Sequence, residues 1–274
     1  MSDRISDRVQ IDLKDGVADV RMVRSDKMNA IDNAMFEALT EAGKVLCADR
    51  AVRAVVLSGE GRAFCAGLDM GSFAAMAGPP RAGEAPTQKL FERGPSGANR
   101  AQLAAWIWQE VPVPVIAAVH GVAFGGGLQI ALGADIRIVA PDARMSVMEV
   151  KWGLIPDMSA SQTLRRLVPI DVAMELTFTG REFSGAEAKE LGLATRVSAT
   201  PREDALALAA EIAGKSPDAI RAAKKLFEDA WHAPTADGLR LEENLQRGLI
   251  GKPNQVESVR SNFEKRAARF QDPG

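Results

Sequence analysis

Three consecutive glycines, Gly125, Gly126 and Gly127, follow an apolar run and precede a helix-like segment. Glycine permits close backbone approaches that a Cβ would block, and the first N–H groups of a helix have no partner within it. Such a segment can bind a developing negative charge through backbone groups alone, or can simply pack a helix tightly against a strand. The spacing is neither Gly-x-Gly-x-x-Gly nor a loop ending in Gly-Lys-Ser/Thr, which argues against a nucleotide phosphate.

A second glycine-punctuated segment, residues 58–70, directly follows the strand-like run 54–57. Together with the glycine triplet and with residues 149–156, read as Glu-Val-Lys-Trp-Gly-Leu-Ile-Pro, it resembles the crotonase superfamily, the enoyl-CoA hydratase/isomerase family. The resemblance runs from about residue 9 to residue 270. It implies an α/β fold, a crotonase-like spiral of ββα units with a C-terminal helical appendage.

The resemblance also implies an oxyanion hole, formed by the backbone N–H groups of Leu68 and Gly126, that binds the thioester carbonyl of an acyl-CoA. Moving a proton next to a thioester places charge on that oxygen, and losing one such donor typically costs about 3 to 4 kcal/mol. Coenzyme A is part of the substrate, so neither a separate cofactor nor a metal is expected. By the same resemblance, the residues expected to bind CoA are Lys27, Ala66, Asp69 and Lys265.

Three polar side chains are candidates for catalysis. Hydratases of this family use two glutamates, and the matching positions here hold Gln129 and Glu149. An amide cannot act as a carboxylate base, although it can orient water or an acyl group through hydrogen bonds. Asp157 stands eight residues beyond Glu149, and this spacing matches the acid/base pair of the dienoyl-CoA isomerase branch, which however carries an acid at the position of Gln129.

Each catalytic candidate has a plainer alternative. Asp157 could cap the helix that follows it, Gln129 could be only a helix former, and Glu149 could be a surface acid. We expect Glu149 to be the base of an enzyme that shifts a carbon–carbon double bond. Hydration of a 2-enoyl-CoA and acyl-CoA binding without catalysis are the two alternatives.

Composition supports a soluble globular protein. The chain has 274 residues, 46% hydrophobic and 26% charged, with a formal net charge of -2, which gives no indication of nucleic-acid binding. Apolar runs stay short of the roughly 20 residues that cross a bilayer, so no membrane association is expected. The first eight residues are charged, unlike a signal peptide, which favours a cytoplasmic location. The two cysteines suggest no disulfide framework, and Cys65 is expected to pack rather than react.

Alternating strand-like and helix-like runs predict the α/β layers that must position these residues. The expected strands are 17–23, 54–58, 113–119 and 135–140, a helix is expected at 33–49, and Ser184 with Glu187 resembles a capping box. Residues 76–100 are expected to form a mobile loop, after which Trp106 and Trp108 line either the acyl pocket or the core.

The last quarter of the chain is predicted to be wholly helical, with segments at 202–216, 217–232, 235–250 and 254–270. This pattern divides the chain into a core with the acyl-CoA site, residues 1–199, and a helical oligomerisation region, residues 200–274. The resemblance implies that this region forms a homotrimer or a hexamer.

Overall fold

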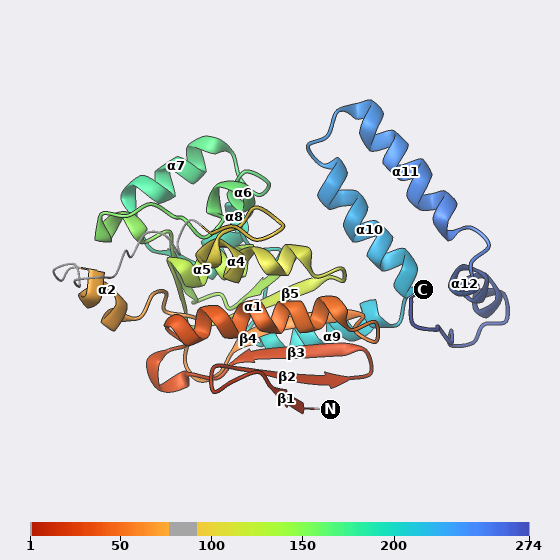
Figure 1. Ribbon diagram of the computed structural model, residues 1–274, viewed down its shortest axis with the longest axis horizontal. Coiled ribbons are helices and arrows are strands. Elements are labelled where there is room, and N and C mark those ends of the chain that lie inside the picture. Colours follow the sequence, from red (N-terminus) through yellow and green to blue (C-terminus); the bar gives the residue numbers. More distant parts are fainter. Residues whose placement is uncertain (1, 77–91, 274) are drawn as a thin grey trace.

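The computed structural model describes residues 2–76 and 92–273, and within them a seven-stranded sheet forms the centre of the molecule (Figure 1). Its order is β1-β2-β3-β4-β5-β7-β10; the first two pairings are antiparallel and the rest are parallel. The strands are β1 (Ser2–Arg4), β2 (Val9–Lys14), β3 (Val17–Met22), β4 (Ala54–Gly59), β5 (Val115–Val119), β7 (Ile136–Val139) and β10 (Arg196–Val197). The four predicted strands are therefore confirmed, with ends shifted by a few residues.

Strand β4 is buried along its whole length because helices cover both faces of the sheet. Val55 and Leu57 pack into the larger core with α1 (Asn33–Ala48), α4 (Arg100–Glu110) and α5 (Gly126–Leu132). The alternate residues Ala54 and Val56 face the second core with α9 (Pro201–Ala213). The carboxyl end of β4 thereby carries the segment 60–69 out of a rigid layer.

A smaller three-stranded sheet lies over the carboxyl ends of these strands within the described part of the chain. It contains β6 (Val122–Phe124), β8 (Arg144–Ser146) and β9 (Phe183–Ser184). Between β8 and β9 the chain forms η2 (Glu149–Trp152), α6 (Ala160–Leu164) and α7 (Ile170–Thr179), and α8 (Gly185–Glu190) follows β9. Ser184 caps α8 by accepting a hydrogen bond from the Glu187 N–H at 3.1 Å. The Glu187 carboxylate binds Arg181 instead, so the predicted capping box is only half formed.

Helix α9 lies against the sheet, whereas α10 (Pro217–Ala230), α11 (Thr235–Leu249) and α12 (Pro253–Phe263) project as an arm at one end of the long axis (Figure 1). The division at residue 199/200 stays a prediction. Several large apolar side chains on the arm are exposed: Phe227, Trp231, Leu239 and Phe263. The arm thus presents apolar surface that the described residues of the same chain leave uncovered.

The prediction of a helix up to residue 270 was wrong, because α12 ends at Phe263. Beyond it the chain folds back on polar contacts that helical periodicity does not reveal. The Glu257 carboxylate accepts the Arg269 N–H at 2.7 Å and pairs with Arg266, while Asn254 binds the backbone of Gln271.

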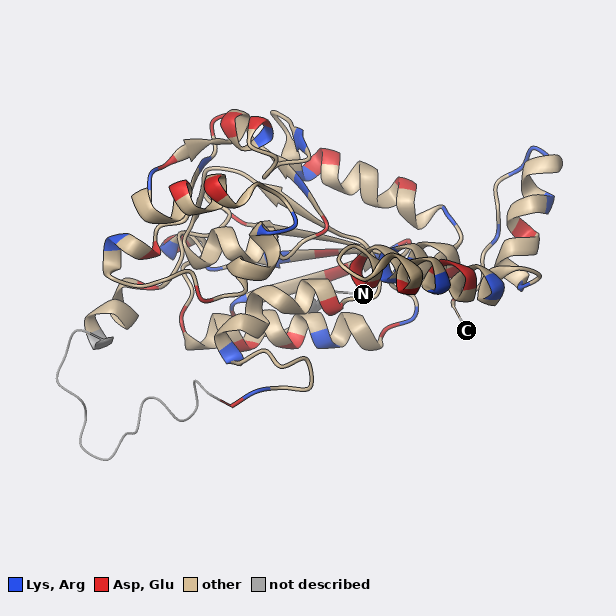
Figure 2. Cartoon of the chain, turned by 90° about the horizontal axis from the view of Figure 1, so that it is seen from above, with Lys and Arg blue, Asp and Glu red and all other residues tan. Residues whose placement is uncertain are grey.

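The segment around residues 76–100 is described only in part, because residues 77–91 lie outside the described ranges. Beyond it, Trp108 is fully buried in the core and donates its indole N–H to the Ala104 carbonyl, so it belongs to the core rather than to a pocket wall. Trp106 is half-buried and packs against the Arg166 guanidinium. Charged residues of both signs are interspersed along the helices and strands (Figure 2), and no described helix is long and apolar enough to cross a membrane.

Candidate active site

The glycine triplet lets the start of α5 touch the segment that follows β4. A Cβ on Gly127 would lie 2.3 Å from the Cys65 carbonyl oxygen, and one on Gly67 would lie 2.6 Å from the Phe124 carbonyl oxygen. Both distances are far below any real contact, so the two backbones approach as closely as they do only because neither residue has a side chain. The same hypothetical Cβ on Gly67 is 3.9 Å from the Gly126 nitrogen, which places Leu68 next to the helix start.

The backbone around Leu68 is held by a short parallel bridge to Ile31. Ile31 donates its N–H to the Gly67 carbonyl at 2.8 Å, and Asp69 donates its N–H to the Ile31 carbonyl at 3.0 Å. In such a bridge the residue between the two bonded positions directs its own N–H to the opposite side. Leu68 therefore has an N–H that points away from Ile31, and the nearby Gly126 is the first residue of α5, where the N–H has no helical acceptor.

Gln129 and Glu149 are directly hydrogen-bonded. The Gln129 amide, 2% exposed, donates from Nε2 to Oε1 of Glu149 at 2.5 Å. Its oxygen accepts the backbone N–H groups of Met158 at 2.8 Å and Ala160 at 3.2 Å. These three bonds fix the orientation of the amide, so Gln129 does more than form a helix: it ties the Glu149 carboxylate to the loop that follows Pro156.

The second oxygen of Glu149, Oε2, is buried and has no hydrogen-bond partner among the described residues. Burial raises the pKa of this carboxyl above its ordinary value, and the negative charge of Asp157 raises it further, while the Gln129 hydrogen bond acts in the opposite direction. Glu149 is only 9% exposed, which rules out the alternative of a surface acid. A carboxylate with one fixed and one free oxygen has the form required of a general base.

Asp157 does not cap the helix that follows it. The N-cap residue of α6 is Ser159, and the helix start has no side-chain cap. Surrounding residues of the same chain partly bury the Asp157 carboxyl, and this desolvation raises its pKa, although much of the residue remains exposed. The two carboxyl groups of Glu149 and Asp157 lie close enough for their charges to interact.

The structure brings three of the four expected CoA-binding residues together. Lys27 is exposed at the end of η1 (Ser25–Lys27), and Ala66 donates its N–H to the carbonyl of the next residue, Met28, at 2.9 Å. Asp69 follows on the same segment as Ala66. Lys265 lies in the segment after α12, at the opposite end of the long axis from α2 (Met70–Met76), and is therefore separated from the others within one chain (Figure 1).

Cys65 directly precedes Ala66 but is fully buried. Its thiol donates to the Asn29 carbonyl at 3.1 Å, and desolvation raises its pKa to about 12. The expectation that Cys65 packs rather than reacts agrees with this environment, because the thiolate is the nucleophilic form.

Two features of the site were missed by sequence reasoning. Arg24 forms an ion pair with Asp69 at 2.7 Å, and Phe73 on α2 stacks on Trp152 of η2 with ring centroids 4.5 Å apart. Both contacts join segments that are far apart in the sequence, and α2 itself was not predicted. No local pattern signals them. The stacked pair links the helix after Leu68 to the turn that carries Glu149.

Gly127→Ala is expected to destabilise the protein by about 1 to 3 kcal/mol and to lower kcat by about 100-fold. The new methyl group would force α5 away from the Cys65 carbonyl and so separate the N–H groups of Leu68 and Gly126. Thermal unfolding and steady-state kinetics test this result. Gly248→Ala is the matched control, since a Cβ there meets nothing within 4 Å and helix α11 tolerates alanine. An active, equally stable Gly127→Ala variant would contradict the close approach.

A family profile described as Enoyl-CoA hydratase/isomerase matches residues 12–273. The mitochondrial enoyl-CoA hydratase domain-containing protein 2 of Mus musculus is 34% identical over 262 residues, covering 93% of this chain and 84% of that protein. A probable enoyl-CoA hydratase of Bacillus subtilis is 32% identical over 254 residues, covering 92% of this chain and 94% of that protein.

Solved structures give the same result. An enoyl-CoA hydratase from Bacillus anthracis superposes with a TM-score of 0.87 at 28% identity, over 97% of this chain and 100% of that one. A putative enoyl-CoA hydratase from Streptomyces coelicolor gives 0.86 at 31% identity, over 97% and 94%. These likenesses confirm the predicted crotonase-like α/β fold class.

Proposed function

Because this chain belongs to the enoyl-CoA hydratase/isomerase family, we propose that it is an acyl-CoA-processing enzyme that shifts a carbon–carbon double bond. The observation that carries the proposal is the hydrogen bond from Gln129 to Glu149. It occupies one carboxylate oxygen, puts an amide where a second carboxylate would assist water, and leaves Oε2 of Glu149 as a single base.

The proposed reaction begins with transfer of a proton from substrate carbon to Oε2 of Glu149. As the C–H bond breaks, its electron pair moves into the conjugated system and charge develops on the thioester oxygen. The N–H groups of Leu68 and Gly126 stabilise that oxygen. Protonation at a different carbon then gives the shifted double bond, with no net change in atoms. The proton returns from Glu149. Alternatively, Asp157 donates a proton to carbon, and exchange with solvent then removes the proton held by Glu149 and restores the one on Asp157; burial raises the pKa of Asp157, which suits a proton donor better than an ordinary surface carboxyl.

Hydration is the second candidate, favoured by the names of the relatives, which include probable enoyl-CoA hydratases. A hydratase would have to activate water with Glu149, either alone or with Asp157. Gln129 cannot remove a proton from water, and its oxygen already accepts two backbone N–H groups. We therefore place isomerisation first.

The purified protein incubated with 2-enoyl-, 3-enoyl- and 3,5-dienoyl-CoA thioesters in deuterated water tests the proposal. We expect the double bond of the product to have shifted, as read from its NMR spectrum, and we expect its mass to lack the gain that added water would give. Deuterium at carbon would report proton exchange with solvent. Net hydration would overturn the isomerase assignment in favour of the second candidate, and tight binding without either reaction would support a non-catalytic acyl-CoA-binding protein.

The apolar residues exposed on α10–α12 support a homo-oligomer in which a second copy covers the arm. The family resemblance suggests that this assembly is a trimer or a hexamer. In such an assembly Lys265 would contact CoA bound to a neighbouring copy rather than to its own chain. We keep the cytoplasmic location as part of this proposal.

Trp152→Ala is expected to raise kcat/KM for long relative to short acyl chains by about 10-fold. The Phe73–Trp152 stack spans the space between α2 and η2, beside the Glu149 turn, so removing one ring opens the acyl side of the site. Kinetics on thioesters of four to twelve carbons give the ratio. Phe73→Ala should shift it in the same direction, and Phe73→Tyr, which keeps the ring, should leave it unchanged. An unaltered ratio in both alanine variants would exclude this pair from the acyl pocket.

A further inference from the structure

We infer that Arg24 is a positioning residue for the oxyanion hole, because it holds the two backbone segments whose bridge directs the Leu68 N–H. The inference rests on the proposed function only in that an oxyanion hole must exist. It applies equally to isomerisation and to hydration.

Arg24 contacts both segments at once. One nitrogen of its guanidinium, Nη1, donates to the Ala30 carbonyl at 2.9 Å and to Oδ2 of Asp69 at 2.7 Å. Ala30 immediately precedes Ile31, and Asp69 immediately follows Leu68. The Arg24 side chain is only 16% exposed and that of Asp69 only 21%, so solvent weakens the pair less than it would on an open surface.

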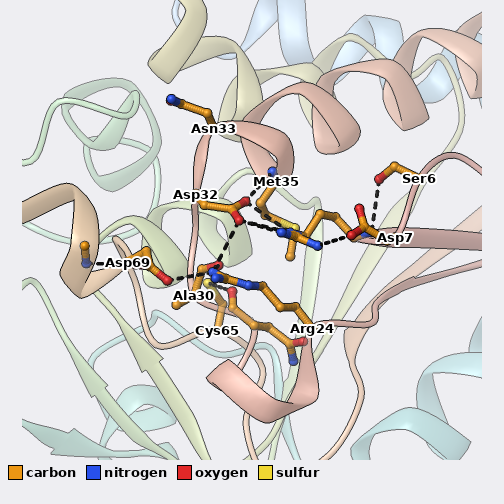
Figure 3. Close-up of polar contacts among 12 residues, drawn as sticks. Ser6, Asp7, Arg24, Ala30, Asp32, Asn33, Met35, Cys65 and Asp69 are labelled. Atoms are coloured by element: carbon orange, nitrogen blue, oxygen red, sulfur yellow. Dashed lines mark hydrogen bonds and ion pairs between the residues drawn. The ribbon is translucent and has the colours of Figure 1, made fainter.

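Two acidic groups face this guanidinium from different segments. Figure 3 shows Arg24 between Asp69 and Asp32, whose Oδ2 lies 3.6 Å from Nη1. Asp32 is anchored independently, because it accepts the Met35 N–H at the start of α1 and binds Arg8 through two nitrogens. The negative charge of Asp32 acts against that of Asp69. Without Arg24, the two carboxylates would repel each other across the bridge.

Asp69 is also fixed on its other side. Its Oδ1 accepts the Gly71 N–H at 2.8 Å, at the start of α2, and this bond together with Arg24 lowers the pKa of the carboxyl. Both carboxylate oxygens therefore have partners within the chain. This arrangement lets the Asp69 side chain orient the Leu68 segment; a contact of Asp69 with CoA stays a prediction.

The test uses Arg24→Gln and hexanoyl-CoA labelled with carbon-13 at the carbonyl, a saturated thioester that has no double bond to shift or hydrate. Isotope-edited infrared spectroscopy of the bound probe measures how strongly the carbonyl is polarised. In the wild-type protein we expect the band to move to lower frequency, as donors at the oxygen require. In Arg24→Gln the band should return most of the way toward its position in free hexanoyl-CoA.

Kinetics on the substrate identified by the thioester panel provide the second readout. Arg24→Gln should lower kcat by about 10- to 100-fold, with KM changed less than about threefold, because the lost interaction acts on the charged transition state. Arg24→Lys should recover part of the loss, since it retains the charge without the guanidinium geometry. Asp69→Asn in the Arg24→Gln background should also recover activity, because it removes the repulsion from Asp32 while retaining an acceptor for Gly71.

Arg202→Gln is the control, since it breaks an ion pair with Asp19 on another part of the molecule and should leave both band and kcat unchanged. A wild-type band that does not move would overturn the oxyanion hole and hence the proposed function. A wild-type shift that Arg24→Gln preserves, with kcat unaltered, would overturn the role of Arg24 alone. If Arg24→Gln does not fold, single Asp69→Asn decides: a retained shift and kcat would refute the inference.

Discussion

Glu149→Gln is expected to reduce kcat for double-bond migration by about 100- to 10,000-fold and to leave the affinity for acyl-CoA nearly unchanged. Glutamine keeps an oxygen that can accept the Gln129 hydrogen bond, so the geometry of the turn is preserved. It cannot accept a proton from carbon, and it replaces Oε2, the carboxylate oxygen that has no hydrogen-bond partner among the described residues. Single-turnover kinetics and a binding titration with a saturated acyl-CoA separate the two effects.

The same substitution is expected to stabilise the fold near neutral pH. Burial raises the pKa of Glu149 in the folded state, so the stability linked to this group is fully present below the unfolded pKa and is lost as pH rises through the folded pKa. The ionised, desolvated carboxylate therefore destabilises the native protein at pH 8. Glutamine removes that cost, and the melting temperature of Glu149→Gln should exceed that of the wild type at pH 8, with a smaller difference at pH 4.

Wild-type activity should rise with pH through the raised pKa of Glu149, because the base must be ionised. Glu182→Gln is a suitable control, since Glu182 is exposed and pairs with Arg144 on the surface. If Glu149→Gln retained isomerisation at the wild-type rate, Glu149 would not be the base. If Glu149→Gln lost both activity and acyl-CoA binding, Glu149 would instead have a role in binding.

Gln129→Glu is expected to reduce isomerisation at neutral pH by at least about 10-fold and to introduce or increase hydration. The substitution replaces an N–H donor by an oxygen 2.5 Å from Oε1 of Glu149. Two carboxylates at such a distance cannot both ionise, so they share one proton or separate to admit a water between them. The first outcome raises the pH at which the base becomes available, and the second produces the two-carboxylate arrangement that hydratases of the family use.

Gln129→Met separates the charge effect from the geometric one. Methionine is similar in length but leaves Met158, Ala160 and Glu149 without their partner, which should destabilise the fold by about 1 to 3 kcal/mol and lower kcat without any gain in hydration. Rates of both reactions between pH 5 and pH 9 compare the variants. Wild-type isomerisation by Gln129→Glu, with an unchanged pH profile, would mean that this hydrogen bond does not control the base.

Local sequence was sufficient where a short segment determines its own backbone. The glycine triplet starts a helix and the segment after β4 follows a strand end, as the local pattern predicted, whereas the Glu149 segment was singled out by the family resemblance. The helix starting at residue 254 was predicted too long, since the contacts of Glu257 and Asn254 with the returning tail are invisible to periodicity. Arg24 and Phe73 went unnoticed for the same reason, as their partners come from other segments.

The role of Gln129 shows a different limit. Its position in the family pattern indicated which residue to examine, but not that both ends of its amide bind groups within the chain. An amide can face water, substrate or protein, and only the fold selects among these. The result changes Gln129 from a possible contact of the acyl group into a support for Glu149.

The buried state of Cys65 has a consequence for the lifetime of the enzyme. A 2-enoyl thioester is an electrophile, and a thiolate next to the segment proposed to bind its carbonyl would add to its β-carbon and inactivate the protein covalently. With its pKa raised to about 12 and its thiol donating to Asn29, Cys65 remains protonated and shielded at neutral pH. The packing that lets α5 approach the Leu68 segment thus also protects the catalyst from alkylation by the compounds on which it is proposed to act.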